Sequence, residues 1–357
     1  MIEPIAIRLE STTYCQLKCP SCPTAHGEIG SKFGNGFLDP ESFKKLVDQN
    51  PAIVHVELSN WGEFLLNQNL AEIVKYAYEK GVVLTASNGV NMNTARKDIL
   101  EVLVKYKFRQ MTCSIDGASQ ESYSKYRING NFDRVIEHIR EINRHKQAYN
   151  TTFPRLLWKF ILFKHNQHEV DKARKMAAEL DMDFFITIPW DDPNSPPADP
   201  EIVRSITRSH VSNRKEYSDK YGSGYQENEI CKQMWNAPQI NWDGRMLGCC
   251  VNRWGDYGNV FESGFSGVIN NEKINYARDM LLGRAEARSD IPCTSCDVYI
   301  NMKRKNNWLK SEETRDSRLM RMASTLGRFG VRLANKSELV GRNTIGRLID
   351  QMYRDLP

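Results

Sequence analysis

Residues 4–22 read PIAIRLESTTYCQLKCPSC, an apolar run followed by three closely spaced cysteines. The run at 4–10 predicts a β-strand, because β-branched and apolar residues favour a pleated, half-buried surface. Cys15, Cys19 and Cys22 then present three thiolates on one short loop. Three cysteines on a [4Fe–4S] cluster leave one iron open for an exogenous ligand, whereas zinc normally takes four ligands. A closed zinc site that uses His26 is the alternative.

Composition places the chain among ordinary globular proteins. It has 357 residues, 40% of them hydrophobic and 26% charged, and its formal net charge is +5. Such a small excess, without a basic patch, does not indicate nucleic-acid binding. No apolar run approaches the roughly 18–20 residues of a membrane span, and the first residues lack a signal-peptide pattern. We therefore expect a cytoplasmic protein whose nine cysteines serve metal or redox chemistry and not disulfides.

Strand-like runs alternate with helical patterns over residues 1–190. After the first strand, further strands are predicted at 53–58, 82–86, 110–115, 156–163 and 184–188. Between them, Asp39-Pro40 has the pattern of a helix start and Gly81 that of a helix stop. Apolar residues at helical spacing predict a helix over 132–145. The alternation predicts an α/β fold, interpreted as a partial (β/α)6 TIM-type barrel, although an open doubly wound sheet has the same periodicity.

The rest of the chain divides into three parts. Residues 191–228 are rich in proline, aspartate and glycine, which predicts a connector. Residues 229–308 form a cysteine-rich region in which Asp243-Gly244, between two apolar runs, predicts a hairpin. Residues 309–357 are basic and helix-forming, so we expect a helical extension that packs on the body. Its apolar positions at loosely helical spacing are Met320, Met322, Leu326 and Phe329.

The cysteine loop after the first strand resembles the signature of the radical S-adenosylmethionine (SAM) superfamily. The resemblance implies a [4Fe–4S] cluster on Cys15, Cys19 and Cys22, whose open iron is chelated by the amino and carboxylate groups of SAM. It also implies reductive cleavage of SAM to a 5′-deoxyadenosyl radical that abstracts hydrogen from a substrate. A reductase such as flavodoxin or ferredoxin is the implied electron donor. Ser21 departs from the aromatic residue that many members carry before the third cysteine.

Further motifs follow the later strands in the order that the family has them. The sequence NWGE at 60–63 resembles the family's Gly-Gly-Glu, with tryptophan in place of the first glycine. The match implies that the carboxylate of this motif binds the cofactor's ammonium. The sequence SNG at 87–89 resembles Thr-Asn-Gly, and the arginine that pairs with the methionyl carboxylate has a counterpart before Gly130. The cofactor-binding residues implied by the resemblance are Gly62, Glu63, Asn88, Ser114 and Arg127.

A second cysteine set occupies the region 229–308. The C-x-x-C pair at 293–296, with Cys231 and one of two adjacent cysteines, makes four thiolates, for which a structural zinc is the alternative. The pattern resembles the auxiliary-cluster domain called twitch, which is related to the longer SPASM domain. It implies one auxiliary [4Fe–4S] cluster, because no cysteine follows Cys296. The implied ligands are Cys231, Cys249, Cys293 and Cys296.

Two classes of function fit these observations: a radical enzyme, and a structural or sensory iron–sulfur or zinc protein. Within the enzyme class, loss of an electron toward the auxiliary cluster gives oxidation, whereas hydrogen return from a thiol gives epimerisation. Cys250 is the candidate thiol, and an inert packed neighbour is its alternative reading. The resemblance to twitch-type enzymes, which oxidise sugar-like cyclitols, implies a carbohydrate or aminocyclitol as the leading candidate substrate. Radical crosslinking or epimerisation of a ribosomally made peptide is the alternative, although Cys15 lies too near the start for a preceding leader-binding module.

Overall fold

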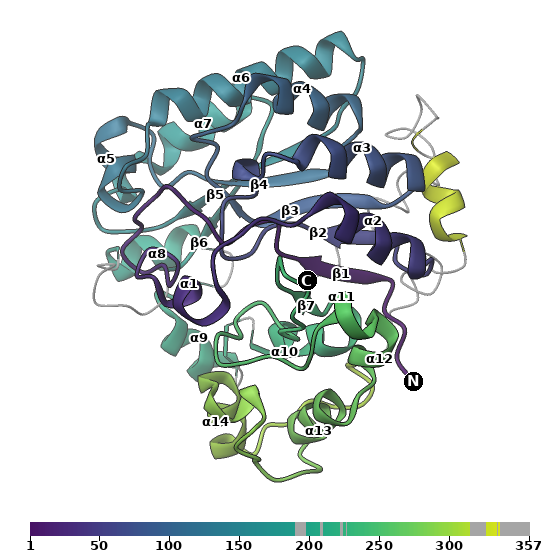
Figure 1. The fold of residues 1–357 in the computed structure, drawn as a ribbon. Helices are drawn as coiled ribbons and strands as arrows, with labels where there is room; N and C mark the ends of the chain where they lie inside the picture. The colour runs from purple at the N-terminus through teal and green to yellow at the C-terminus, as the bar shows by residue number, and fades with distance from the viewer. Residues whose placement is uncertain are drawn as a thin grey trace.

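The structure is a computed structural model that describes residues 1–189, 198–207, 210–221, 224–225, 227–314, 326–333 and 335. A parallel sheet with the strand order β6-β5-β4-β3-β2-β1-β7 lies at its centre (Figure 1). Six of its strands alternate with helices, as the sequence predicts. They are β1 (Ala6–Leu9), β2 (His55–Glu57), β3 (Val83–Val90), β4 (Gln110–Ser114), β5 (Arg155–Ile161) and β6 (Asp183–Thr187).

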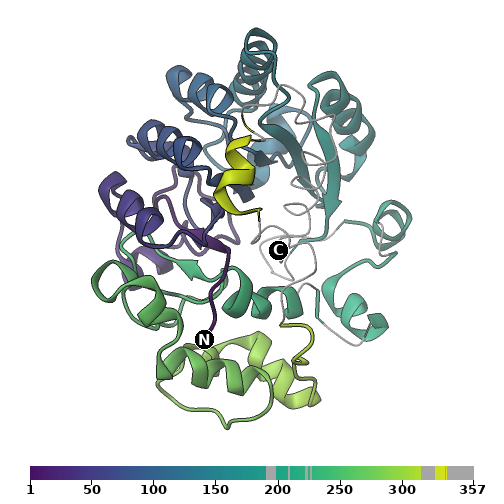
Figure 2. The same ribbon diagram turned by 90° about the vertical axis from the view of Figure 1, so that its right-hand side faces the viewer.

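Strand order separates the two architectures that the periodicity leaves open. From β1 to β6 each strand pairs in parallel with the next one along the chain. A doubly wound sheet reverses its strand order at a switch point, whereas here the order runs one way through all six. The fold is therefore the predicted partial barrel, with its helices around the outside (Figure 2).

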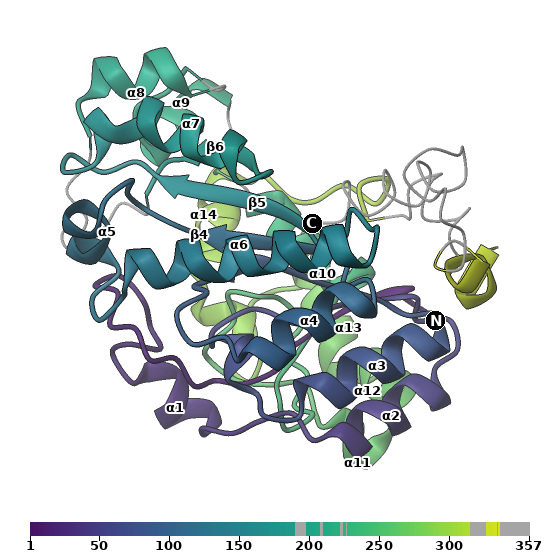
Figure 3. The ribbon, with the colours of Figure 1, turned by 90° about the horizontal axis from the view of Figure 1, so that it is seen from above.

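The outer helices begin and end at residues that the sequence marks. They include α2 (Pro40–Gln49), α3 (Leu70–Lys80), α4 (Lys97–Lys105), α5 (Gln120–Tyr126), α6 (Phe132–Ala148) and α7 (Val170–Glu179). Asp39 caps α2 by accepting from the Ser42 amide at 2.9 Å. Gly81 ends α3 in the left-handed conformation, with φ of 73°. Figure 3 shows α2, α3, α4 and α6 as a row along one side of the sheet.

The strands separate an apolar outer face from a polar inner one. On β5, Trp158 and Phe160 are buried in the hydrophobic core, while Lys159 between them lies on the opposite face. Register places Glu57 of β2 beside Thr85 of β3 on that inner face, and the Thr85 hydroxyl donates to the Glu57 carboxylate at 2.6 Å. The barrel interior therefore carries charged and hydroxyl groups, and those of Glu57 and Thr85 are hydrogen-bonded within the protein.

The cysteine-rich region joins the barrel through its sheet. β7 (Gln239–Ile240) pairs in parallel with β1, so the sheet continues from one part of the chain into the other. The hairpin predicted at Asp243-Gly244 is present, since the Asn241 amide donates to the Arg245 carbonyl at 2.8 Å and Gly244 has φ of 90°. The helical elements of the cysteine-rich region are α10 (Glu227–Asn236), α11 (Val260–Ser263), α12 (Phe265–Ile269), α13 (Glu272–Leu281), η3 (Pro292–Ser295) and α14 (Asp297–Lys305).

The segment expected as a connector, 191–228, contains helices within its described residues. These are α8 (Pro200–Ile206) and α9 (Arg214–Tyr221). Asp199 caps α8 by accepting from the Glu201 amide at 2.9 Å, with Pro200 at the first helical position. This is the same Asp-Pro start signal that precedes α2. The high proline and aspartate content of the whole segment led to the prediction of a connector, so this helix start was not predicted.

The described part of the C-terminal extension contacts the barrel through a valine and an arginine. The helical segment 326–333 packs on the body as expected, but Leu326 and Phe329, noted for their helical spacing, are 41% and 64% exposed. Instead Val331 is buried, and the Arg328 guanidinium donates to the carbonyls of Val47 and Asn50, at the end of α2, and of Ile53. The last carbonyls of a helix need such donors, so a polar side chain anchors the segment. It is drawn in yellow beside α2 and α3 (Figure 1). Met320 and Met322 lie outside the described residues.

Candidate active site

The three-cysteine loop leaves β1 and lies over the carboxyl ends of the barrel strands. Leu17 and Cys19 are buried in a small apolar cluster with Tyr126 and Phe163, which docks the loop on the barrel. The Cys22 amide donates to the Cys19 carbonyl at 3.1 Å and closes a turn between these two cysteines. Cys15 and Cys22 remain half-buried on the same loop. Packing thus fixes the loop that carries the three cysteines, which the resemblance assigns to one cluster.

The loop after β2, which carries the NWGE sequence, is fixed against the cysteine loop. The Glu63 amide donates to the Tyr14 carbonyl at 2.8 Å. A Cβ on Gly62 would lie 2.0 Å from the Thr12 carbonyl oxygen, so no side chain fits at this position. The absence of a side chain at Gly62 therefore lets the loop after β2 pack closely against the backbone of the cysteine loop.

Glu10, which directly follows β1, fixes the loop after β2 through its carboxylate. Its carboxylate accepts from the amides of Trp61 at 2.8 Å and Gly62 at 3.3 Å. The side chain is buried, and desolvation raises its pKa to about 7, against the lowering effect of these amides. Sequence reasoning missed Glu10, because nothing in the sequence shows which loop folds over the end of β1.

The Glu63 carboxylate, expected to bind the cofactor's ammonium, is set in a defined orientation. One oxygen accepts from the Asn91 amide at 2.6 Å and the other from the Leu65 amide at 3.2 Å. Burial raises the pKa of Glu63 to about 7, and the two amides oppose that shift. A cation next to this carboxylate would favour its ionised form. The geometry therefore fits an ammonium partner.

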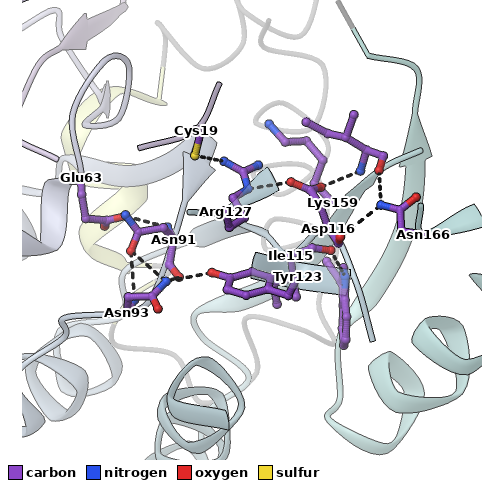
Figure 4. Close-up of polar contacts among 12 residues, drawn as sticks. Cys19, Glu63, Asn91, Asn93, Ile115, Asp116, Tyr123, Arg127, Lys159 and Asn166 are labelled. Carbon is purple, nitrogen blue, oxygen red and sulfur yellow. Dashed lines mark hydrogen bonds and ion pairs between the residues drawn. The ribbon is translucent and has the colours of Figure 1, made fainter. Parts of the chain in front are cut away.

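Arg127 reaches from the end of α5 to the cysteine loop (Figure 4). Its Nη1 lies 3.5 Å from the Cys19 sulfur, and its Nε donates to Asp116 at 2.6 Å. The other oxygen of Asp116 accepts from the Ile161 amide at 2.7 Å. This ion pair, anchored to β5, holds a guanidinium beside one of the expected cluster ligands. A guanidinium here suits a carboxylate that chelates the open iron.

Ser114 ends β4 and Asn88 lies within the neighbouring strand β3, and the two residues differ in their surroundings. Ser114 is buried at the end of β4, and its hydroxyl faces Gly89. The sequence at 87–89, expected after the third strand, lies inside β3 where its register with β4 is irregular. The Asn88 side chain donates to the Asn60 side chain at 2.9 Å. Asn88 therefore orients the loop after β2.

An amide network, which sequence reasoning also missed, follows β3. The Asn91 side chain accepts from Gln16 at 2.7 Å, and its Nδ2 lies 3.6 Å from the Cys15 sulfur. The Asn93 side chain donates to the Tyr123 hydroxyl at 2.8 Å and accepts from the Asn131 amide at 2.6 Å. These bonds connect the cysteine loop with α5 and α6, and Figure 4 shows the part that runs from Glu63 through Asn91 and Asn93 to Tyr123. The only sequence signal was a pair of asparagines just beyond a predicted strand.

The second cysteine set converges on one pocket. Cys231 comes from α10, Cys249 follows the hairpin, Cys293 lies in η3 and Cys296 precedes α14. All four line a single pocket with apolar neighbours, while Cys250 is not among its lining residues. The Tyr257 hydroxyl lies 3.3 Å from the Cys293 sulfur. Four thiolates around one apolar pocket fit an iron–sulfur cluster. In the described ranges, no three His, Cys, Asp or Glu side chains are arranged to hold a single metal ion.

The two sites share an interface. The Asn60 side chain donates to the Cys250 carbonyl at 3.1 Å, and the Cys250 amide donates to Gln233 at 2.8 Å. Arg253 pairs with Glu28 of α1 (Glu28–Phe33) at 2.9 Å. Residues 249–250 form a bend and a turn, so Cys249 and Cys250 do not lie in an extended segment, in which adjacent side chains would point to opposite faces. The auxiliary cysteines are therefore held next to the loop that carries Glu63.

Comparisons with known proteins agree with this arrangement. The family model of the Radical SAM superfamily matches residues 9–157. The model of an iron-sulfur cluster-binding domain, SPASM, matches residues 231–297. The chain belongs to the radical SAM superfamily. A radical SAM domain implies a [4Fe–4S] cluster with SAM, and a SPASM domain implies auxiliary iron–sulfur binding. The predicted radical SAM enzyme is confirmed at this level, against the structural or sensory alternative.

Solved structures of radical SAM enzymes share the fold. Streptococcus suis SuiB bound to S-adenosylmethionine is 15% identical, with a TM-score of 0.59 over 86% of this chain and 76% of SuiB. SuiB bound to its precursor peptide SuiA is 14% identical, with a TM-score of 0.56 over 87% of this chain and 76% of SuiB. The enzyme anSMEcpe with bound AdoMet is 15% identical, with a TM-score of 0.57 over 98% of this chain and 100% of the other. No curated protein matches the sequence. None of the helices in the described part of the radical SAM chain has the length and apolarity that a bilayer crossing needs.

Proposed function

We propose that this radical SAM enzyme oxidises a hydroxylated carbon of a polar small molecule, most simply the carbinol of a carbohydrate or aminocyclitol. Cys15, Cys19 and Cys22 would hold a cluster that, with SAM, would supply hydrogen-abstraction chemistry, and the second cysteine set would hold a cluster that could accept one electron. Conversion of a carbinol to a ketone removes one hydrogen atom, one electron and the hydroxyl proton, which passes to solvent. A reductase such as flavodoxin or ferredoxin would deliver the electron that starts each turnover.

The residues of this chain orient the reactants. Glu63 takes the ammonium of SAM and Arg127 its carboxylate, because a buried carboxylate and a guanidinium flank the cysteine loop. Gly62 and Glu10 fix the loop that carries Glu63, and Ser114 offers a hydroxyl from the end of β4. Near the carboxyl ends of the strands, the side chains of Ser114 and Lys159 are polar groups that could bind a hydroxylated substrate.

The hydrogen bond between Asn60 and the Cys250 carbonyl, at 3.1 Å, carries the proposal. It joins the loop with the Glu63 motif to the turn next to Cys249, and Asn88 extends the same chain of bonds into β3. A contact network of this kind favours electron acceptance close to the reacting carbon. The position of Cys250 at the same junction favours a second candidate reaction, epimerisation by hydrogen return from its thiol.

Product analysis distinguishes these reactions. The anaerobic enzyme with both clusters, SAM and a reductant is incubated with a panel of sugars, sugar phosphates and aminocyclitols. Oxidation yields a ketone lighter by two hydrogen atoms together with 5′-deoxyadenosine. Epimerisation yields a product of unchanged mass. Turnover of a peptide, with none of the small molecules consumed, would replace the proposed substrate class by radical peptide modification.

A further inference from the structure

Lys159 stands on the inner face of the barrel, near the carboxyl end of β5. It is the register partner of Ser114 on β4. A Cβ built on Gly89 of β3 would lie 2.7 Å from the Ser114 hydroxyl and 3.4 Å from the Lys159 Nζ. Three adjacent strands therefore bring an ammonium, a hydroxyl and an uncovered stretch of backbone together. Figure 4 shows Lys159 extending beside Arg127, on the side of the site where Cys19 lies.

The Lys159 ammonium has no carboxylate partner among the described residues. Its Nζ donates to the backbone carbonyl of Asn88 at 2.9 Å. Asp116, the nearby carboxylate, already accepts from Arg127 at 2.6 Å and from the Ile161 amide at 2.7 Å. Burial and the charge of Arg127 lower the pKa of Lys159 to about 8, and Asp116 opposes this shift only in part. A partly buried cation without an ion pair is costly, so an anion from outside would be favoured here.

We propose that Lys159 binds an oxyanion of the substrate, a carboxylate or a phosphate, at the mouth of the barrel. This inference rests on the proposed function and narrows its substrate to an acidic carbohydrate or a related polar acid. Arg127, beside Cys19, is the cation available to the cofactor's own carboxylate. Arg127 thus binds the carboxylate of the cofactor, and Lys159 binds the oxyanion of the substrate. Ser114, the register partner of Lys159, adds a hydroxyl donor.

Lysine labelling tests the site without turnover. The anaerobic enzyme with both clusters and SAM is treated briefly with an amine-acylating reagent, and mass spectrometry quantifies each modified lysine. Inorganic phosphate and acetate are the two probes, with chloride at equal ionic strength as reference. Lys175, exposed on α7, is the internal control. We expect at least one of the probes to slow labelling of Lys159 several-fold and to leave Lys175 unchanged. The more protective probe identifies phosphate or carboxylate as the preferred anion.

Three results would overturn the assignment. The first is equal labelling of Lys159 with phosphate, acetate and chloride, and the second is equal protection of Lys159 and Lys175. The third is full protection of Lys159 when SAM is added without either probe, which would assign the lysine to the cofactor. Because no product is measured, failure here leaves the oxidation of a carbinol to be judged by product analysis.

Equilibrium dialysis with the favoured probe provides the variant test. Lys159→Met should weaken its binding at least tenfold, while Lys159→Arg and the control Lys175→Met should bind as the native enzyme does. Binding should decline as the pH rises through about 8, because the neutral amine no longer attracts an anion. Native affinity for the probe in Lys159→Met would contradict the site. Loss of binding in Lys159→Arg as well as in Lys159→Met would also contradict it, because a positive charge at this position should suffice.

Discussion

Asn60 donates its side-chain amide to the backbone carbonyl of Cys250 at 3.1 Å, across 190 residues of sequence. The contact joins the loop after β2 to the turn that follows Cys249. Asn88 donates to Asn60 from β3 at 2.9 Å, so three segments meet at one amide. The second cysteine set and the loop that carries Glu63 are therefore connected through Asn60.

Cys250→Ala separates oxidation from epimerisation. If the enzyme epimerises, this variant should form 5′-deoxyadenosine without the inverted product, because the hydrogen donor is gone. Turnover in deuterated water checks the role, since an exchangeable thiol places deuterium at the inverted carbon. An oxidised product without deuterium, unchanged in the variant, would exclude the donor role. Iron content must equal that of the native enzyme for either comparison.

Gly62→Ala should impair the cofactor site. The added Cβ would lie 2.0 Å from the Thr12 carbonyl oxygen, so the loop that carries Glu63 must shift. We expect at least a tenfold weaker affinity for SAM, measured by calorimetry on the protein with both clusters. Gly267→Ala is the matched control, because no atom lies within 4 Å of its added Cβ. Native affinity in Gly62→Ala would show that the loop tolerates displacement.

Arg328→Met should detach the C-terminal segment from the barrel. The guanidinium loses bonds of 2.7, 2.7 and 2.8 Å to three backbone carbonyls. Hydrogen bonds to charged groups contribute about 1.5–3 kcal/mol each before solvent exposure reduces them. We expect the midpoint of thermal unfolding to fall by several degrees. Arg332→Met, an exposed position on the same helical segment, should leave it nearly unchanged.

Local patterns predicted the barrel well, because strands and helix caps depend on neighbouring residues. Asp39 caps α2 and Gly81 ends α3 as expected. The residues that complete the site were harder to predict. Glu10 and Lys159 acquire their partners only when separate strands align, so no sequence spacing identifies them. Helical periodicity singled out Phe329 in the C-terminal extension, but Phe329 is exposed and Val331 is the buried residue, because periodicity does not show which surface a helix meets.

Iron analysis tests the two cysteine sets. Seven thiolates on two cubanes should give about eight irons per chain. The Cys15/Cys19/Cys22→Ala triple variant should retain about four, because the pocket lined by Cys231, Cys249, Cys293 and Cys296 is unaltered. Zinc without iron in the triple variant would make the second site structural and exclude it as an electron acceptor.

Formation of 5′-deoxyadenosine from SAM tests the central assignment most directly. The anaerobic enzyme with both clusters and a reductant should release 5′-deoxyadenosine. Cys15→Ala, Cys19→Ala and Cys22→Ala should each abolish that release, because each cysteine is proposed to supply one of three protein ligands to the catalytic cluster. Cys113→Ala, at a buried position of β4 outside both cysteine sets, should retain it. Undiminished 5′-deoxyadenosine formation in any of the three loop variants would contradict radical SAM chemistry at this loop.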